Sequence, residues 1–235
     1  MTLKDDLIAK VWEYITSTWG VIPNGYVVPT EESLTLGNSG TRINATVFYA
    51  DINGSTDMVD ALSDTLAAEY YKAYLYCAAK IIKSNDGTIT AYDGDRVMAI
   101  YIGTAQAKSA VRTALELNWA MGNIINQTFA GSYSTAHRVL QHTVGIDSGP
   151  LLVAKTGVRV DSDLVWVGPA ANYAAKLTGF DGLDPNFQIR ITEQAMRALG
   201  IGTFIKPDGT TIWDGPYDNI KRGKHYRTDC HMAFA

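Results

Sequence analysis

Cysteine, long apolar runs and basic charge are all scarce in this sequence of 235 residues. Its two cysteines, Cys77 and Cys230, form no CxxC pair and have no histidine at metal-ligand spacing, which argues against a disulfide framework or a zinc site. No apolar run approaches the roughly 18 residues of a membrane span, and acidic residues near the start are atypical of a signal peptide. We therefore expect a cytoplasmic protein with reduced cysteines and no membrane contact.

Acidic residues outnumber basic ones, 24 Asp and Glu against 20 Lys and Arg, for a net charge of −4. A nucleic-acid surface normally needs a basic stripe that neutralises several phosphates, so we expect no nucleic-acid partner. A small anion held through metal ions remains compatible with this charge. Apolar residues make up 46% of the chain, without a compositional break, which is typical of one globular core.

Apolar spacing predicts long helices interleaved with paired strands. This order favours an α+β fold of the ferredoxin-like type, an antiparallel-rich sheet with helices packed on one face. Residues 1–43 are expected to form a helical arm, for packing or dimer contact, and an irregular connection; residues 44–235 form the main domain. We expect helices at 5–19, 65–84, 105–129 and 169–177, and strands at 45–52, 88–92, 97–102, 138–147, 151–155 and 164–167, with a turn at 148–150.

Two aspartates stand at positions where carboxylates can converge. Asp51 lies at the end of a predicted buried strand, and Asp95 lies in the Asp-Gly hairpin turn that follows Tyr92. Either aspartate alone is more often a turn former, as Asp93 is expected to be. Together they match Mg²⁺, which prefers carboxylate oxygens completed by waters and substrate phosphates. The pair therefore predicts a metal site that binds a triphosphate.

Three separated segments carry the strongest signal: Phe48–Thr56, Tyr92–Ala99 and Val167–Leu177, with a weaker match at Gly145–Gly149. Together they resemble the class III nucleotidyl (adenylate/guanylate) cyclases, a likeness that covers roughly residues 44–229. The resemblance implies the cyclase catalytic fold for residues 44–235 and closure of a nucleoside triphosphate to a 3′,5′-cyclic nucleotide with release of pyrophosphate. It also implies two divalent ions, Mg²⁺ or Mn²⁺, bound by Asp51, Asp95 and the main-chain carbonyl of Ile52.

Asn172 and Lys176 lie four residues apart on the predicted third-segment helix and so project from one face. By resemblance, Asn172 orients the ribose, and Lys176 stands where the family has an arginine that stabilises charge on the α-phosphate. Lysine is a point charge without the planar fork of arginine, so it neutralises a phosphate without gripping two oxygens. The resemblance also implies a head-to-tail homodimer, in which this pair completes the site of the partner's aspartates.

The positions that read the base in purine cyclases hold Ala91 and Val165 here. Because these side chains cannot hydrogen-bond to a purine edge, the sequence disfavours ATP and GTP. It is most similar to the pyrimidine cyclases of Pycsar anti-phage systems, which make cyclic CMP or cyclic UMP. Tyr49, Tyr92 and Arg96 are candidates to stack on or hydrogen-bond the pyrimidine. The choice between cytosine and uracil stays open.

Several of these residues also have simpler interpretations. Tyr49 can equally be a core aromatic, and Arg96 can pair with Asp93 or Asp147. The late basic residues resemble the family's contact to the terminal phosphates, although such clusters are more often solvated. They are Lys221, Arg222 and Lys224, of which Lys224 is our candidate substrate contact.

Three functions remain open from the sequence. The leading hypothesis is a pyrimidine cyclase whose product is a second messenger of anti-phage defence, read by a separate effector protein. The second is a purine cyclase that reads its base with unfamiliar residues. The third is a non-catalytic, cyclase-like module that senses nucleotides, which the retained metal aspartates disfavour.

Overall fold

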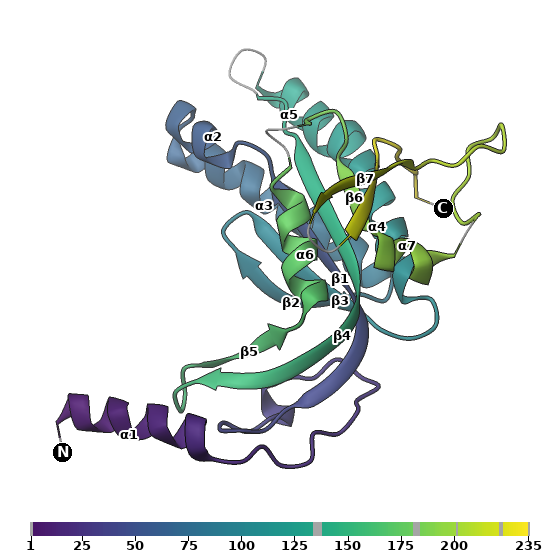
Figure 1. The fold of residues 1–235 in the computed structure, drawn as a ribbon. Coiled ribbons are helices and arrows are strands. Elements are labelled where there is room, and N and C mark those ends of the chain that lie inside the picture. The colour runs from purple at the N-terminus through teal and green to yellow at the C-terminus, as the bar shows by residue number, and fades with distance from the viewer. Residues whose placement is uncertain (1, 134–137, 181–183, 201, 221–222, 235) are drawn as a thin grey trace.

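The computed structural model of the chain describes residues 2–133, 138–180, 184–200, 202–220 and 223–234. Within these residues eight strands form one sheet in the order β2-β3-β1-β4-β6-β8-β7, and β5 pairs with β4 (Figure 1). All strand pairs are antiparallel except β4 with β6. The strands are β1 Thr41–Ile52, β2 Thr88–Asp93, β3 Arg96–Tyr101, β4 His142–Gly157, β5 Ser162–Val167, β6 Ile189–Thr192, β7 Asp214–Ile220 and β8 Gly223–Thr228.

Helices cover both faces of this sheet, whereas the sequence analysis predicted one. The central strand β1 is apolar on both faces: Phe48 and Ala50 face the larger core with α3 and α4, and Ala45 and Val47 face α6. A strand buried on both faces needs a helix on each, which is why the one-face prediction is wrong for α6. The helices are α1 Leu3–Thr16, α2 Ser55–Ala61, α3 Asp64–Ser84, α4 Gln106–Ala120, α5 Gln127–Ser132, α6 Pro169–Thr178 and α7 Glu193–Leu199, with a 3₁₀ turn at Glu31–Ser33 and a π-helical stretch at Met121–Asn126.

The turn predicted at residues 148–150 does not exist, because β4 runs unbroken through it. Pro150 lies opposite Asn44 of β1, beyond the part of β4 that pairs with β6 and before the part that pairs with β5. The second edge of β4 is therefore without a strand partner at this position, and the missing N–H of proline costs no ladder hydrogen bond. The long β1–β4 ladder overrides the local turn signal of Ser148, Gly149 and Pro150.

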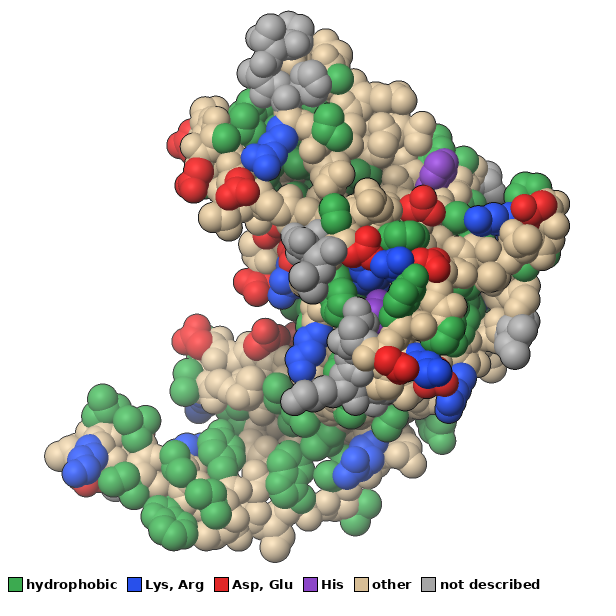
Figure 2. Space-filling view, turned by 45° about the horizontal axis from the view of Figure 1, so that its top comes forward, with side chains coloured by type: hydrophobic (Ala, Val, Ile, Leu, Met, Phe, Trp, Pro, Cys, Tyr) green, Lys and Arg blue, Asp and Glu red, His purple; other side chains and the backbone are tan. Residues whose placement is uncertain are grey.

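The first helix, α1, makes no packing contact that buries any of its side chains. Leu7, Val11, Trp12 and Ile15 are each more than half exposed. They belong to the apolar side chains on the projecting arm at the lower left of Figure 2. Packing of this arm on its own protomer, one of its two predicted roles, is thus not observed, and dimer contact stays a prediction.

The remaining element predictions are largely confirmed. The predicted long helix at 65–84 is α3, and the one at 105–129 is a continuous path through α4, the π-helical stretch and α5. The helix α2 was missed because Asn53–Thr56 was interpreted only as a strand break. Both cysteines are free and partly buried. Among the helices of the described ranges, none has the length and apolarity to cross a bilayer.

Candidate active site

The two predicted metal aspartates lie on neighbouring segments at one end of the β1–β3 ladder. Ala50 of β1 pairs with Val97 of β3, so Asp51 at the end of β1 lies beside the start of β3. Asp95 occupies the tight turn that joins β2 to β3, directly before that start. Gly94 supplies the positive φ of 61° that this turn requires. The antiparallel register thus brings together two carboxylates that are 44 positions apart in the chain.

Arg96 pairs with Asp51 at this end of the ladder. Its Nε and Nη2 atoms donate hydrogen bonds to Oδ2 of Asp51, at 3.1 and 2.5 Å. The hydrogen bond that the guanidinium donates to Asp51 raises the pKa of Arg96, and the charges of Asp51, Asp93 and Asp95 add to this effect. The simpler pairing of Arg96 with Asp93 or Asp147 is therefore not the one observed. Asp147 instead accepts a hydrogen bond from a threonine hydroxyl of β6.

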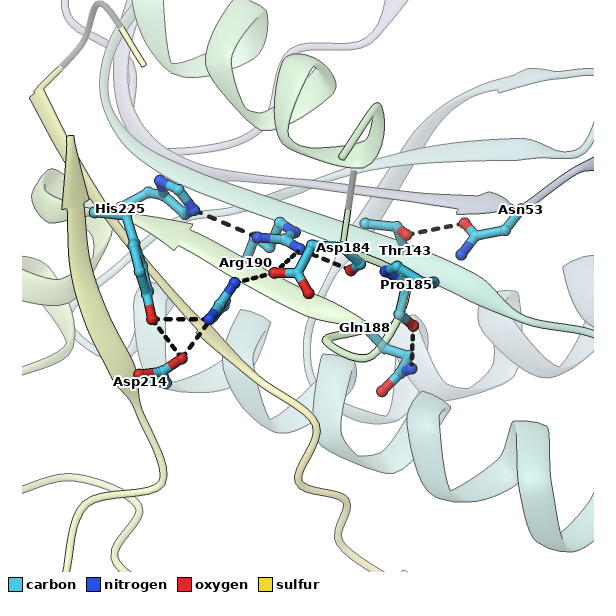
Figure 3. Close-up of polar contacts among 10 residues, drawn as sticks. Asn53, Thr143, Asp184, Pro185, Gln188, Arg190, Asp214 and His225 are labelled. Carbon is cyan, nitrogen blue, oxygen red and sulfur yellow. Dashed lines mark hydrogen bonds and ion pairs between the residues drawn. The ribbon is translucent and has the colours of Figure 1, made fainter. Parts of the chain in front are cut away.

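The main chain after Asp51 is held on the β4 side. Ile52 pairs with His142, and the N–H of Asn53 donates to the carbonyl of Gln141 at 2.9 Å. The hydroxyl of Thr143 donates to Oδ1 of Asn53 at 2.9 Å (Figure 3). These contacts fix the segment whose carbonyl at Ile52 is the predicted main-chain ligand.

A buried tyrosine lies behind the two aspartates. Tyr74 of α3 is fully buried, and its hydroxyl lies 3.3 Å from Nδ1 of His142. Burial raises the pKa of Tyr74, and the charges of Asp51 and Asp95 raise it further, so both carboxylates lie within electrostatic range of this phenol. No motif pointed to Tyr74 or His142, and the only sequence signal was a tyrosine on a core helix.

Asn118 determines which nitrogen of His142 carries the proton. Its Nδ2 donates to the carbonyls of Asp229 and Cys230, each at 3.0 Å, which leaves Oδ1 to face Nε2 of His142 at 3.3 Å. Nε2 must then donate, and Nδ1 accepts from the hydroxyl of Tyr74. Burial lowers the pKa of His142 to about 4, so the ring is neutral in this chain of hydrogen bonds.

The carboxylates of Asp51 and Asp95 fit a pair of divalent cations. Oδ2 of Asp95 is buried and has no hydrogen-bond partner among the described residues, an arrangement that is costly unless a cation binds there. In the described part of the chain, no group of three or more histidine, cysteine, aspartate or glutamate side chains could hold a metal ion. Two aspartates with a triphosphate meet the needs of Mg²⁺ without such a cage.

Three predicted base contacts gather in one cavity of about 200 Å³. Tyr49 is half-buried there, and this burial raises the pKa of its phenol. The volume is below the roughly 300–1,000 Å³ of ordinary ligand pockets. The lining residues are Tyr49, Ala91, Asp93, Arg96, Met98 and Ala175.

Other predicted contacts lie elsewhere. Tyr92 is 54% exposed and lines a groove between α3 and β2, away from the Tyr49 cavity. Val165 is 40% exposed on β5, and Lys224 is exposed on β8. Within one protomer the structure therefore groups neither Tyr92, Val165 nor Lys224 with Arg96. Lys221 and Arg222 lie outside the described residues.

Asn172 and Lys176 lie on the side of α6 that faces away from the sheet. Both are exposed, whereas Ala174 and Leu177 are buried against the strands. The Nζ atom of Lys176 lies 4.9 Å from the ring centroid of Tyr173. These two polar side chains therefore project outward from their own protomer, where a second molecule can meet them.

Comparisons with known proteins agree with this geometry. Residues 39–216 match the family model described as the adenylate and guanylate cyclase catalytic domain. The chain is 46% identical to the uridylate cyclase of Xanthomonas perforans over 215 residues, covering 91% of this chain and 90% of the relative. It is 47% identical to the uridylate cyclase of Burkholderia cepacia over 184 residues, covering 77% and 80%.

Solved structures show the same fold. The adenylyl cyclase CyaB of P. aeruginosa superposes with a TM-score of 0.66 at 22% identity, covering 80% of this chain and 94% of that one. At this identity the likeness supports the fold alone. The α+β prediction, with a mostly antiparallel sheet and packed helices, is confirmed.

Proposed function

The chain belongs to the adenylate and guanylate cyclase catalytic domain family of class III nucleotidyl cyclases, and from this premise we propose that it is a uridylate cyclase. It would convert UTP to 3′,5′-cyclic UMP and pyrophosphate. The observation that carries the proposal is the 46% identity to a uridylate cyclase over nearly the full length of both chains. These relatives favour uracil where the residues alone left cytosine and uracil open.

The residues around the cavity support a pyrimidine. Ala91 lines it without a hydrogen-bonding group, so the cavity lacks the polar contact that a purine edge would need there. Tyr49 offers a ring on which a base can stack, and Arg96 donates hydrogen bonds to a base carbonyl. Val165, at the second base position, is equally apolar. A small base with two carbonyl oxygens matches these contacts.

Asp51, Asp95 and the carbonyl of Ile52 would hold two divalent ions, Mg²⁺ or Mn²⁺. When bound, such ions would supply Lewis-acid chemistry, which would lower the pKa of the ribose 3′-hydroxyl and offset charge on the leaving pyrophosphate. In the reaction a bond forms between the 3′-oxygen and the α-phosphorus, the α–β bridging bond breaks, and the hydroxyl proton is released. The chain itself positions UTP: Asn172 orients the ribose, and Lys176 and Lys224 neutralise phosphate charge.

A homodimer supplies the missing wall of the site. Asn172 and Lys176 point away from their own sheet, and the Tyr49 cavity is too small for a nucleotide by itself. In a two-fold dimer each protomer would lend these residues to the aspartates of its partner and form two shared sites. A monomer would then be inactive. The exposed apolar side chains of α1 are available to add to this contact.

The biological role is a separate part of this proposal. A cyclic pyrimidine nucleotide is a small diffusible anion, so a separate effector protein would have to read it. We place this signal in anti-phage defence, as for the Pycsar cyclases that the sequence resembles. The test of this role is protection of bacteria from phage by the wild-type gene expressed together with a candidate effector gene from its neighbourhood, and loss of protection with Asp95→Ala.

The activity itself is tested with one substrate panel. ATP, GTP, CTP and UTP are each incubated with Mn²⁺ or Mg²⁺, and products are identified by mass spectrometry. We expect cyclic UMP from UTP at a rate at least about ten times that of any other cyclic product, and no activity with Asp51→Ala or Asp95→Ala. Cyclic AMP or cyclic GMP as the main product would overturn the pyrimidine assignment. The absence of any product would favour a nucleotide-sensing module.

The shared site is tested by mixing two inactive proteins. Asp51→Ala lacks a metal ligand but keeps Asn172, and Asn172→Ala keeps both aspartates. An equal mixture contains about half heterodimers, each with one intact site of two, so about a quarter of wild-type activity should return. No return of activity, with subunit exchange confirmed, would contradict the shared site.

A further inference from the structure

A buried ion-pair network lies beside α6, on the face of the sheet that α6 covers. Arg190 of β6 pairs across the ladder with Arg227 of β8, while its neighbours Ile189 and Ile191 are buried in the core on the opposite face. The side chain of Arg190 is only 1% exposed, and a buried charge of this kind must be paired. The network therefore has a strong requirement for its partners.

Asp184 bridges the two arginines, as Figure 3 shows. Its carboxylate accepts from Nη2 of Arg190 at 3.1 Å and from Nη1 of Arg227, and its main-chain carbonyl accepts from Arg190 at 3.0 Å. Nε of Arg227 donates to Asp214 of β7 at 2.8 Å, and Nη2 donates to the hydroxyl of Tyr217 at 2.8 Å. The Asp184 carboxylate thus connects β6 and β8 to the segment that follows α6, and Arg227 extends the network to β7.

Aromatic rings enclose both guanidinium groups. The Arg227 guanidinium carbon lies 4.0 Å from the ring centroid of Phe187 and 4.2 Å from that of Tyr217. The corresponding carbon of Arg190 lies 5.0 Å from the ring of Phe180, which comes two residues after the end of α6. The Arg227 guanidinium, held by two carboxylates and between two rings, therefore has little freedom to shift.

The elements that this network joins, α6 and β8, carry three of the proposed substrate contacts. Phe180 and Asp184 follow the helix of Asn172 and Lys176, and Arg227 shares β8 with Lys224. On the other strand edge, Gly145 of β4 pairs with Arg190. The spacing between α6 and β8 therefore depends on these ion pairs.

We propose that Asp184, Arg190 and Arg227 are positioning residues, which hold α6 over β6 and β8 so that Asn172 and Lys176 reach the triphosphate in the partner's site. This inference rests on the proposed cyclase function and its shared site. It assigns the network to the half-site that a protomer lends to its partner, and not to the half-site that contains its own aspartates. Neither the motifs nor the relatives singled out these residues.

The test places Asp184→Asn on one side of the mixed dimer at a time. On the Asp51→Ala protein, which supplies the intact Asn172 half, it should lower the restored kcat/KM at least about tenfold, mainly through a higher KM for UTP. On the Asn172→Ala protein, which supplies only the aspartates, it should leave the restored activity within about twofold. Arg227→Lys, which keeps the charge but loses the fork, should show the same asymmetry.

The control is Glu193→Gln, which breaks an exposed ion pair with Arg197 on α7 at 2.8 Å and should change neither mixture. Circular dichroism and unfolding curves verify that each variant folds. An equal loss on both sides, or no loss on either, would overturn the positioning role. If the parent mixture without Asp184→Asn shows no activity, the shared site itself fails, and this proposal fails with it.

Discussion

Asp95, a proposed metal ligand, is a single side chain at which stability and the proposed function make opposite demands. One of its carboxylate oxygens is buried without a hydrogen-bond partner in the described residues, which is unfavourable for the protein alone. Asp51, in contrast, has the guanidinium of Arg96 as a partner. An unpartnered carboxylate beside a paired one is what a cation site requires before its ions arrive. Because this burial should lower the free energy of unfolding, a binding role for Asp95 can be tested by stability measurements as well as by turnover.

Asp95→Asn is expected to remove activity, by roughly a hundredfold or more, because a neutral amide is a poor ligand for Mg²⁺. In chelator its free energy of unfolding should equal or exceed that of the wild type by up to about 1 kcal/mol, since the side chain whose Oδ2 position is buried is then neutral. Urea unfolding with and without Mn²⁺ and a UTP analogue measures both effects. Asp86→Asn, at an exposed position whose positive φ asparagine tolerates, is the matched control. A clear destabilisation by Asp95→Asn alone would contradict this account.

The helix α6 can lie where it does only because β4 has a glycine beneath it. A Cβ atom on Gly145 would come within 2.0 Å of the carbonyl oxygen of Ala174 and 2.9 Å of Cβ of Leu177. Backbone atoms of a packed helix cannot yield by such distances without moving the whole helix. This close approach requires glycine at position 145 and sets how near α6, which carries Asn172 and Lys176, lies to β4.

Gly145→Ala is therefore predicted to destabilise the protein by about 3 kcal/mol and to displace α6, because overpacking against backbone is not relieved by a rotamer change. Activity should fall even in the fraction that stays folded. Gly122→Ala, on a helix where an added Cβ meets nothing within 4 Å, should leave stability and activity unchanged or slightly improved. Thermal unfolding and UTP turnover of the two variants provide the comparison. A Gly145→Ala protein with wild-type behaviour would show that α6 is not held by this contact.

Buried neutral histidines make the stability of the entire fold sensitive to acid. Burial lowers the pKa of both His142 and His225 to about 4, and for His225 the charges of Arg190 and Arg227 contribute as well. Both folded-state values lie below the ordinary value of 6.5. Protons therefore bind the unfolded chain first, so that stability is unaffected above about pH 6.5 and declines as the pH falls toward 4.

His142→Gln should remove part of this acid sensitivity. Glutamine can still accept from Tyr74 and donate to Asn118, but it cannot bind a proton. Between pH 7 and pH 5 the wild type is expected to lose about 2 kcal/mol more unfolding free energy than the variant. This follows from the pKa of His142, which is about 4 in the folded protein and 6.5 in the unfolded chain. Urea unfolding across this range measures the difference, with the exposed His231→Gln as control. Parallel curves for wild type and His142→Gln would rule out the buried neutral ring as the cause.

Local signals in the sequence located the segments that carry the candidate site. A strand end, an Asp-Gly turn and a Gly-Pro helix start predicted the segments of Asp51, Asp95 and Asn172, because each depends on a few neighbouring residues. The substitutions at Ala91 and Val165 pointed away from purines for the same local reason. The family and the fold class, inferred from these segments, are confirmed by the matching family model and the similar folds.

Long-range pairing decided the rest. The partner of Arg96, the proximity of Tyr74 and His142 to the aspartates and the bridge from Asp184 to two arginines all join residues from different strands and helices. No local pattern encodes them, since they depend on strand order and on which face each helix covers. The unbroken β4 and the second-face position of α6 have the same origin, because the free energy of burying both faces of β1 exceeds the local preference for a turn.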